Sequence, residues 1–320
     1  MLTEKQKEEL LKLMSDVKLD EPLNQHTYFR IGGPAEAFLP YKYSLDYRPL
    51  KSVLVFCANE NIPVTVLGGG SNVLILDEGL LGLVLRLDTG NIMMIPPYEE
   101  NEPRIIQVDS GCSMQKLVKF TLSFGLTGLE PFLGLPGTVG GAVYNNAHFK
   151  RDQLFDDFVT KVWTIPFLQD NSMRENCYRK SQLEFGYDHS LFQSLSHKEI
   201  IILVEIALKK GDKQEVEALT EKLLKERRSS QPLDMPSSGC IFKNPENCPS
   251  AGWIIEHAGL KGLHVGGAEV STKHANFIIN PEKKATAADV LALMKIIHGT
   301  VLERFDILLE PEIFILGKGV

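Results

Sequence analysis

Two glycine-rich stretches of the sequence could bind an anion without the help of a charged side chain. Residues 133–146 read L-G-L-P-G-T-V-G-G-A-V-Y-N-N, and residues 68–72 read G-G-G-S-N. Glycine adopts backbone angles closed to other residues and lets another molecule approach the main chain closely. Successive backbone N–H groups can form a concave site for a phosphate or a diphosphate. The alternative is an ordinary series of tight turns, which either stretch taken alone favours.

Neither stretch matches a common nucleotide-binding motif. Residues 137–141 (G-T-V-G-G) lack the G-K-[ST] ending of a Walker loop, and Val73 stands where the third glycine of G-x-G-x-x-G belongs. Kinase-type and Rossmann sites are therefore disfavoured. A dinucleotide held between two loops of another kind stays open.

A third set of candidate residues lies in the second half of the chain, and its chemistry would come from side chains. Cys240 stands in S-S-G-C-I-F-K-N-P, where a turn of small residues leads into an apolar pair. A thiol with a pKa near ~8.5 is protonated at neutral pH and can donate a proton, although a lone cysteine is more often a small buried hydrophobe. Glu310 and Glu312 precede an apolar strand, where carboxylates are usually solvated but one pointing inward could polarise a substrate. His274 is a further candidate polar contact, with an ordinary core or surface histidine as the alternative.

The elements that would position these residues alternate unevenly between helix and strand, which favours an α+β fold over a regular doubly wound sheet. Thr3 and Gln6 have capping-box spacing and predict a short first helix. The charged amphipathic segment 212–228 and the small polar residues after it predict a domain boundary. Further helices are predicted at 49–60, 113–124, 212–228, 251–258 and 286–305, and strands at 27–31 (running into a glycine turn), 63–67, 73–76, 81–87, 104–108, 159–167, 200–208, 277–280 and 313–316.

The composition excludes several classes of protein. The 320 residues are 43% hydrophobic and 23% charged, as in a globular protein large enough for two domains. A net charge of −7 without a long basic run argues against nucleic-acid binding. The five cysteines form no C-x-x-C pair and the histidines lack metal-ligand spacing, so no metal site is predicted and a reducing compartment is. The charged N-terminus and the lack of a long apolar run predict a cytoplasmic protein without a signal peptide or membrane insertion.

Seven motifs, in the same order, resemble the UDP-N-acetylenolpyruvoylglucosamine reductase (MurB) family of peptidoglycan synthesis. They are R-I-G-G-P-A, L-G-G-G-S-N-V-L-I, P-G-T-V-G-G-A-V-Y-N-N-A, F-G-Y, S-G-C-I-F-K-N-P, A-G-W-I-I-E and L-E-P-E, spread between about Asn24 and Gly317. The lack of a large tyrosine-bearing insertion between Ile241 and Trp253 makes the chain similar to the shorter, type II form. The resemblance implies an FAD-binding domain of the PCMH/vanillyl-alcohol-oxidase type followed by a smaller α/β substrate-binding domain. The predicted division is an N-terminal helix at 1–22, the FAD-binding domain at 23–211 and the substrate-binding domain at 212–320.

The resemblance also implies a reaction and the residues that take part in it. FAD takes a hydride from NADPH and passes it to the enolpyruvyl double bond of UDP-N-acetylglucosamine enolpyruvate, giving UDP-N-acetylmuramate. Cys240 holds the position of the family's proton donor, and a glutamate matching Glu312 assists it. Tyr187, Arg228 and Asn244 match positions on the substrate side. The residues that match the FAD site are Gly68, Gly69, Gly70, Ser71, Asn72, Pro136, Gly137, Thr138, Gly140, Gly141, Ala142 and Asn145.

The sequence departs from the family pattern at three places. Asp188 stands where the family usually has an arginine that helps to stabilise the enolate, so an acid replaces a cation unless His189 or Arg228 compensates. Residues 148–149 change the edge of the expected flavin site, and Ser230 replaces a common lysine. Two alternatives therefore stay open: another FAD oxidoreductase with the same cofactor fold, or a catalytically impaired flavin- or nucleotide-binding protein. The oligomeric state is not predicted.

Overall fold

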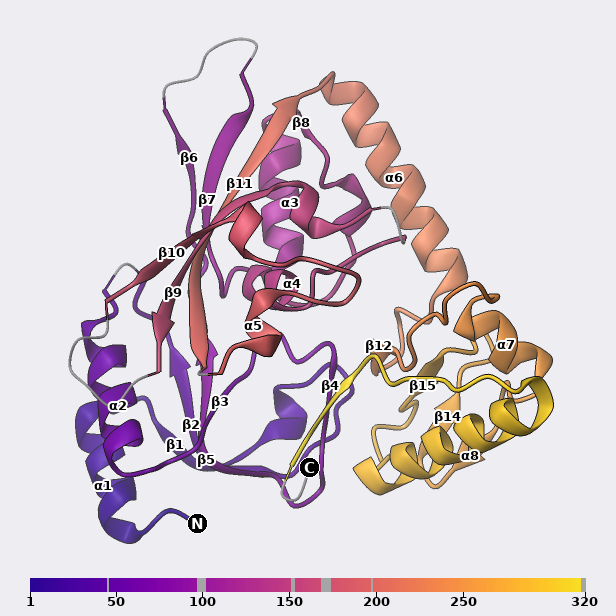
Figure 1. The fold of residues 1–320 in the computed structure, drawn as a ribbon, viewed down its shortest axis with the longest axis horizontal. Coiled ribbons are helices and arrows are strands. Elements are labelled where there is room, and N and C mark those ends of the chain that lie inside the picture. Colours follow the sequence, from indigo (N-terminus) through magenta and orange to yellow (C-terminus); the bar gives the residue numbers. More distant parts are fainter. Residues whose placement is uncertain (45, 97–101, 151–152, 168–173, 197, 318–320) are drawn as a thin grey trace. The chain divides into compact units, whose positions relative to one another are not determined.

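The structure, a computed structural model, describes residues 1–44, 46–96, 102–150, 153–167, 174–196 and 198–317. The chain forms two compact units, and each is assembled from segments that are separate in sequence (Figure 1). The first unit comprises residues 1–18, 37–69 and 82–226, and the second comprises 19–36, 70–81 and 227–320. The sequence predicts contiguous domains that meet at 211–212, whereas each compact unit is built from separate segments of the chain. The predicted division describes function and stays a prediction.

The largest sheet of the first unit is antiparallel and has β11 (Glu199–Lys210) at its centre. The apolar run at 200–208 is mostly buried there, which explains the strong strand signal of its sequence. Helices α3 (Met114–Ser123) and α4 (Val139–Tyr144) contribute side chains to the same core as this sheet. The strand order is β10 (Asn176–Arg179), β9 (Val159–Pro166), β11, β7 (Arg104–Asp109) and β6 (Ile92–Ile95), with β8 (Leu126–Thr127) paired to the end of β11.

A four-stranded sheet follows from the N-terminal part of the chain. Its order is β1 (Lys18–Pro22), β2 (Pro34–Tyr41), β5 (Leu80–Leu87) and β3 (Val64–Val66), and β3 runs parallel to β5. Helices α1 (Glu4–Leu13) and α2 (Arg48–Asn59) lie side by side (Figure 1). The predicted capping box is confirmed, because Thr3 Oγ1 accepts from the Gln6 N–H at 3.3 Å and Gln6 Oε1 accepts from the Thr3 N–H at 2.9 Å.

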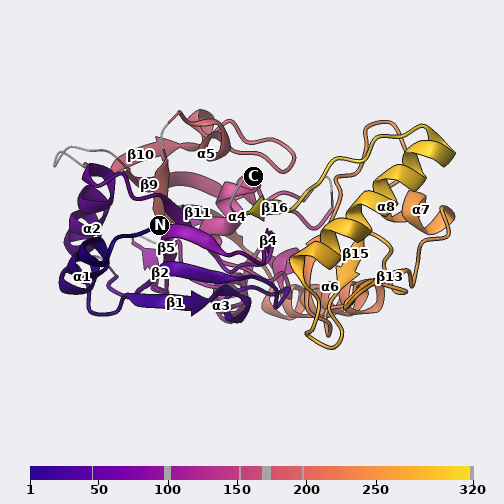
Figure 2. The ribbon, with the colours of Figure 1, turned by 90° about the horizontal axis from the view of Figure 1, so that it is seen from below.

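The second unit is built on a small antiparallel sheet. Its strand order is β12 (Ser237–Cys240), β15 (Phe277–Ile279), β14 (Ala268–Val270) and β13 (His264–Val265). Helix α8 (Ala287–Phe305) packs on β13 and β14 and also contacts α7 (Ala251–His257) (Figure 2). Strand β16 (Phe314–Leu316) runs parallel to β4 (Val73–Ile75), which joins the C-terminal end of this unit to an early segment of the chain.

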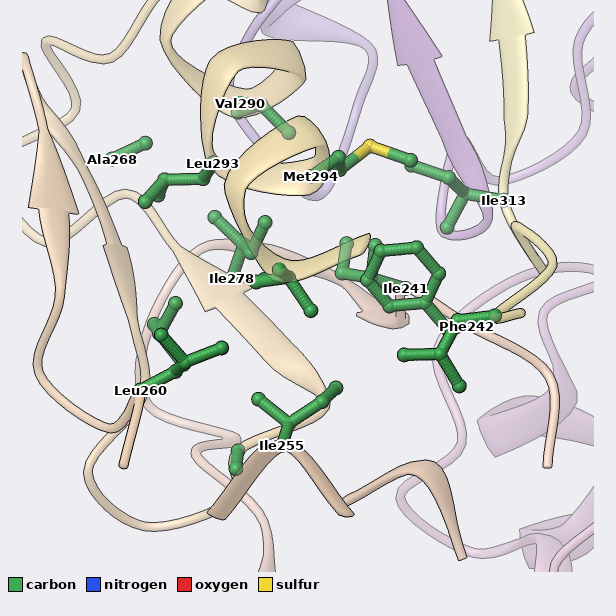
Figure 3. Close-up of a cluster of buried hydrophobic side chains, with 14 of the residues drawn as sticks. Ile241, Phe242, Ile255, Leu260, Ala268, Ile278, Val290, Leu293, Met294 and Ile313 are labelled. Atoms are coloured by element: carbon green, nitrogen blue, oxygen red, sulfur yellow. The ribbon is translucent and has the colours of Figure 1, made fainter. Parts of the chain in front are cut away.

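The core of the second unit lies between α7, α8 and the sheet. Val290, Leu293 and Met294 of α8 gather in one buried cluster with Ile278 of β15 and Ile241, which follows β12 (Figure 3). Ile241 and Phe242, which directly follow Cys240, both belong to this cluster, so packing holds the backbone next to the cysteine.

The predicted helices and most predicted strands are confirmed to within two residues at each end. The strand predicted at 27–31 is wrong. There the chain turns, since Thr27 Oγ1 donates to the Ile31 carbonyl at 2.9 Å and Arg30 has a φ of +59°. Phe29 and Ile31, the two neighbours of Arg30 in the sequence, are both buried. Apolar residues therefore alternate with a polar one here, as they do in many strands.

Helix α4 was not expected within a glycine-rich stretch, because glycine is a poor helix former. The remaining long helix is α6 (Lys213–Ser230), which the sequence predicts. The short elements are α5 (Leu191–Ser194) and 3-10 turns at Leu23–Gln25, Glu130–Phe132, Phe155–Asp157 and Lys180–Gln182. Among the described helices none combines the length and the apolar character needed to cross a membrane.

Candidate functional site

The two glycine-rich stretches meet in the first unit, backbone against backbone. A Cβ atom built on Gly69 would lie 2.6 Å from the Cα of Gly137, and one built on Gly68 would lie 3.0 Å from Oγ1 of Thr138. No side chain fits at Gly69 unless the two loops move apart. Pro136 leads into Gly137, whose φ of +121° is a conformation that favours glycine. The structure thus brings together two stretches that the sequence analysis pairs.

Four backbone donors at this contact have no partner among the described residues. In the described parts of the chain, the N–H groups of Gly68, Gly69, Gly137 and Thr138 donate to no other group. An anion with several oxygens, such as a diphosphate, suits donors of this kind because it can accept from more than one of them. The contact therefore fits the cofactor role that the sequence predicts for these residues.

The next N–H groups along the chain are already used at the start of α4. Gly140 donates to the Ser110 carbonyl at 2.7 Å, and the residue before it donates to the Cys112 carbonyl at 2.9 Å. Thr138 accepts from the next two N–H groups: its Oγ1 accepts from Gly141 at 3.3 Å, and its carbonyl accepts from Ala142 at 2.9 Å. A Cβ on Gly140 would lie 2.8 Å from Cβ of Ser110, so this glycine is needed for packing. A contact with FAD at Gly140, Gly141 or Ala142 would use groups other than these N–H groups.

The remainder of the first glycine loop belongs to the second unit. Gly70 has a φ of +66°, and a Cβ there would lie 2.3 Å from the His26 carbonyl oxygen. Asn72 Nδ2 donates to the Glu312 carbonyl at 3.4 Å, and the Asn72 carbonyl accepts from the first residue of β16 at 3.1 Å. Ser71 is half-buried. Asn72 therefore lies against the segment that carries Glu312.

Cys240 and Glu312 lie on neighbouring antiparallel segments of the second unit. Cys240 ends β12, which pairs with β15. After it the chain pairs with the Glu310–Glu312 segment, since Lys243 donates to the Glu310 carbonyl at 2.8 Å and Glu312 donates to the Ile241 carbonyl at 2.8 Å. Both Cys240 and Glu312 are half-buried. The two residues predicted to be catalytic are therefore held on adjacent backbones.

The other cysteines differ from Cys240 in their surroundings. Burial raises the pKa of the Cys57 thiol to about 12 and that of Cys112 to about 11, so these two stay protonated in the core. Cys177 and Cys248 are exposed. The intermediate position of Cys240, at a strand end, is the one that suits a group which must stay protonated and still meet a substrate.

A buried asparagine that the sequence analysis does not select holds the Cys240 segment in place. Asn276 is 2% exposed, and its side chain makes both possible bonds to the backbone of Phe242. Its Oδ1 accepts from the Phe242 N–H at 3.0 Å, and its Nδ2 donates to the Phe242 carbonyl at 2.7 Å. Its own carbonyl accepts from the Ile241 N–H at 2.8 Å. Asn276 therefore fixes the backbone just after the cysteine.

The buried arginine near Cys240 is Arg227 and not its neighbour. Arg227 is 4% exposed, whereas Arg228, which the sequence analysis selects, is exposed. Burial lowers the pKa of Arg227 to about 10, and Cys240 is near enough to act on that pKa in the opposite direction. The Arg228 carbonyl accepts from Lys273 Nζ at 2.5 Å. The buried cation of this region is thus one residue away from the predicted one.

Asn244 has a structural contact at the start of α7. Its Oδ1 accepts from the Ala251 N–H at 2.9 Å, beside the N-cap residue Ser250. His274, the other polar candidate of the sequence analysis, packs against Phe277, with 4.8 Å between ring centroids, and burial lowers its pKa. Its surroundings are those of a core histidine.

Tyr187 and Asp188 lie in a turn of the first unit that faces the end of α4. The His148 ring lies 4.8 Å from the Tyr187 ring, and His148 Nδ1 lies 3.2 Å from Asp188 Oδ1. Asn145, which ends α4, accepts from Gln193 at 3.5 Å. The acid that replaces the family arginine is therefore paired with a histidine that is itself a departure from the family pattern.

Comparisons with known proteins cover most of the chain. Residues 231–316 match the family model described as "UDP-N-acetylenolpyruvoylglucosamine reductase, C-terminal domain", and residues 46–164 match the model "FAD binding domain". The UDP-N-acetylenolpyruvoylglucosamine reductase of Heliobacterium modesticaldum is 38% identical over 299 residues, which is 93% of this chain and 90% of that protein. That of Listeria monocytogenes is 35% identical over 303 residues, 94% of this chain and 95% of that protein.

A solved structure gives the same result. The UDP-N-acetylenolpyruvylglucosamine reductase (MurB) of Thermus caldophilus is 33% identical and superposes with a TM-score of 0.72, covering 93% of this chain and 97% of its own. The chain belongs to the UDP-N-acetylenolpyruvoylglucosamine reductase family.

Membership of the UDP-N-acetylenolpyruvoylglucosamine reductase family confirms the predicted resemblance and the α+β fold with an FAD-binding domain, and makes the protein an FAD-dependent oxidoreductase. The FAD-binding match contains both glycine-rich loops. Their close backbone approach and the four unpaired N–H groups fit the diphosphate of this cofactor. The individual site residues stay predictions.

Sequence reasoning overlooked Asn276, Arg227 and the link between His148 and Asp188. Asn276 carries a weak signal, since an amide directly before the apolar strand β15 needs a partner when buried. Nothing in the sequence distinguishes Arg227 from Arg228, because both end the same charged helix. The partners His148 and Asp188 are 40 residues apart, and only the fold brings them together.

Proposed function

We propose that the protein reduces the enolpyruvyl group of UDP-N-acetylglucosamine enolpyruvate to UDP-N-acetylmuramate for peptidoglycan synthesis, with NADPH as the reductant. The observation that carries this proposal is the placement of Cys240 beside the Glu312 segment in a chain of this family. A cytoplasmic location is part of the proposal, because NADPH and nucleotide sugars are held there.

The cofactor side of the proposed reaction depends on backbone groups. When bound, FAD accepts a hydride from NADPH and delivers it to one carbon of the enolpyruvyl double bond. Gly68, Gly69, Gly137 and Thr138 would hold its diphosphate through their N–H groups. Their close contact fixes the distance between the two loops, so the donors need little rearrangement when the anion binds.

The substrate side needs a proton and a response to negative charge. Hydride addition leaves an enolate-like charge on the substrate, and the neighbouring carbon must then receive a proton. We assign this proton to the Cys240 thiol, whose thiolate is afterwards reprotonated by water. Glu312, on the adjacent segment, would hold the proton donor and the substrate in register. Arg227 would stabilise the thiolate that forms, because it is a buried cation near Cys240.

Anaerobic spectroscopy tests the function. Purified protein should be yellow, should bleach with NADPH, and should regain its colour when UDP-N-acetylglucosamine enolpyruvate is added, with one UDP-N-acetylmuramate formed per flavin reoxidised. Bleaching without recovery by this substrate would favour another FAD oxidoreductase or an impaired flavin protein. A protein that binds no flavin would contradict the proposal.

A further inference from the structure

The turn at 186–190 holds a buried acid in an unusual backbone conformation. Asp188 is 4% exposed and has a φ of +52°, in the left-handed region that side chains rarely adopt. Gly186 and His189 close the turn with two mutual backbone bonds of 3.1 and 3.3 Å. The closed turn therefore keeps Asp188 in the left-handed region, which aspartate adopts more readily than most residues other than glycine.

The Asp188 carboxylate accepts no hydrogen bond in the described parts of the chain, and a histidine nitrogen lies within ion-pair distance of it. His148 Nδ1 lies 3.2 Å from Oδ1, within ion-pair distance but without the geometry of a hydrogen bond. A carboxylate taken out of water costs much free energy unless an opposite charge or donors replace the water. The His148 ring, whose Nδ1 lies beside the acid, offsets the charge of Asp188 when the ring is protonated.

The pair lies beside the predicted substrate residue Tyr187, whose ring contacts the His148 ring. Three side-chain bonds tie the turn and the residues after it to the end of α4, and a fourth lies on the turn side. Ser190 Oγ and Gln193 Nε2 donate to the Tyr144 carbonyl at 2.7 and 2.9 Å. Gln193 Nε2 also donates to the Asp188 carbonyl at 3.0 Å, and Asn146 Nδ2 donates to the Gly186 carbonyl at 2.9 Å. Because α4 begins at the glycine loop, the position of the pair is fixed relative to that loop.

We propose that His148 is the cationic group that meets the negative charge of the substrate, and that Asp188 is the positioning residue that holds it. The proposal rests on the proposed function. With Nδ1 directed at Asp188, Nε2 is the ring atom left to donate a hydrogen bond to the substrate carboxylate and to the enolate charge that develops on it. No proton is lost in this role. The two departures from the family pattern, the acid at 188 and the histidine at 148, then depend on each other. His148 supplies the cation that the family pattern places at position 188.

The decisive variants are His148→Gln, Asp188→Asn and the charge swap Asp188→Arg with and without His148→Gly. We expect His148→Gln to slow the reoxidation of reduced flavin by UDP-N-acetylglucosamine enolpyruvate about 10²-fold, the effect of losing one donor to a developing oxyanion. Flavin content and reduction by NADPH should not change. Asp188→Asn should slow reoxidation less. His189→Gln is the matched control, since it removes the other imidazole next to Asp188, and it should behave like the wild type.

The Asp188→Arg variants distinguish two cases: His148 and Asp188 act as a coupled pair, or each of them only packs in its own place. Asp188→Arg alone places two cations against each other in a buried site and should lower the reoxidation rate below that of the wild type. Adding His148→Gly should recover most of this loss, because the cation has then moved back to position 188. A rise in turnover for Asp188→Arg alone, or a double variant no faster than the single one, would overturn the proposal.

Ligand binding gives a readout that does not depend on turnover. UDP-N-acetylmuramate carries a carboxylate that UDP-N-acetylglucosamine lacks, so the ratio of their Kd values, measured by calorimetry on the oxidised protein, reports the cation. His148→Gln should reduce the preference for the carboxylate ligand by about tenfold, and His189→Gln should keep it. A wild type that binds neither ligand overturns both the proposed function and this assignment. A wild type that binds and turns over, with a His148→Gln variant that equals it, overturns the assignment alone.

Discussion

The glycine loops of the first unit and the Cys240 segment of the second unit offer different groups to a ligand. The loops present backbone N–H groups at Gly68, Gly69, Gly137 and Thr138 that donate to no described residue. The Cys240 segment presents side chains instead, on a backbone that is hydrogen-bonded to Asn276 and to the Glu310–Glu312 segment.

The difference shows which parts of a site can tolerate substitution. At the loops the main chain is the functional group, so any added side chain acts through steric contact and damages the whole site. At Cys240 the backbone is a support, so a side chain can be changed while the fold and the cofactor loops keep their geometry. Variants in the two regions should therefore fail in different ways.

The largest effect is expected from Gly69→Ala. The new Cβ would lie 2.6 Å from the Cα of Gly137, backbone that cannot move without separating the loops. We expect the purified variant to lose most of its flavin, measured as the absorbance ratio of bound flavin to protein, and to unfold with a free energy lower by about 1–3 kcal/mol.

Gly299→Ala is the matched control for this prediction. It adds the same methyl group in α8, where a Cβ would have no atom within 4 Å, and it replaces a poor helix former. This variant should keep its flavin and its activity. A Gly69→Ala protein with a full complement of flavin would contradict the role given to the contact between the loops.

An intermediate effect is expected from the two arginines at the end of α6. Arg227→Gln removes the buried cation near Cys240 and should slow reoxidation of the flavin by substrate by about tenfold or more, because a nearby opposite charge favours the thiolate by about one pKa unit or more. Arg228→Gln changes an exposed side chain and should cost less. The opposite order of effects would support the role that the sequence predicts for Arg228.

The smallest effect is a pH dependence of stability in the sheet beneath the cofactor loops. Burial alone would raise the pKa of Glu205 on β11, but hydrogen bonds from Lys161, Gln107 and Thr160 outweigh it and the pKa lies below its ordinary value of 4.5. Because the folded pKa is the lower one, Glu205 contributes stability above about pH 4.5, and this contribution is lost as the pH falls through the folded value.

Glu205→Gln should therefore lower the free energy of unfolding at pH 7 by about 1 kcal/mol, measured by denaturant titration. The gap between variant and wild type should narrow toward pH 3. A gap that stays constant between pH 7 and pH 3 would show that the carboxylate charge of Glu205 is not what these hydrogen bonds stabilise.

Much of the fold can be predicted from the sequence because its elements carry local signals. Ile200–Leu208 is apolar almost throughout, which indicates a buried strand, and the capping box of Thr3 and Gln6 indicates the start of a helix. The strand predicted at 27–31 is wrong because a turn can bury both sequence neighbours of Arg30 just as a strand can. Helix α4 is hard to predict because glycine is a poor helix former, and Gly140 is needed for the close contact with Ser110.

The residues of the candidate site can be predicted from the sequence only where the type of a residue indicates its role. The glycine loops stand out because close backbone contacts require glycine at fixed positions. Arg227 and Arg228 cannot be told apart in the same way, because adjacent residues of a helix point about 100° apart and the end of α6 has no apolar pattern to set the register. The ion pair of His148 and Asp188 depends on the fold alone.

The central claim, that proton donation by Cys240 is separate from cofactor binding by the glycine loops, is tested most directly by measuring both half-reactions of Cys240→Ala in an anaerobic stopped-flow instrument. We predict normal flavin content and normal reduction by NADPH, with reoxidation by UDP-N-acetylglucosamine enolpyruvate slower by about 10²–10⁴-fold, while Cys240→Ser, which keeps a proton donor, retains substantial activity. A Cys240→Ala protein that is reoxidised as fast as the wild type would contradict the account and leave the thiol as a packing group.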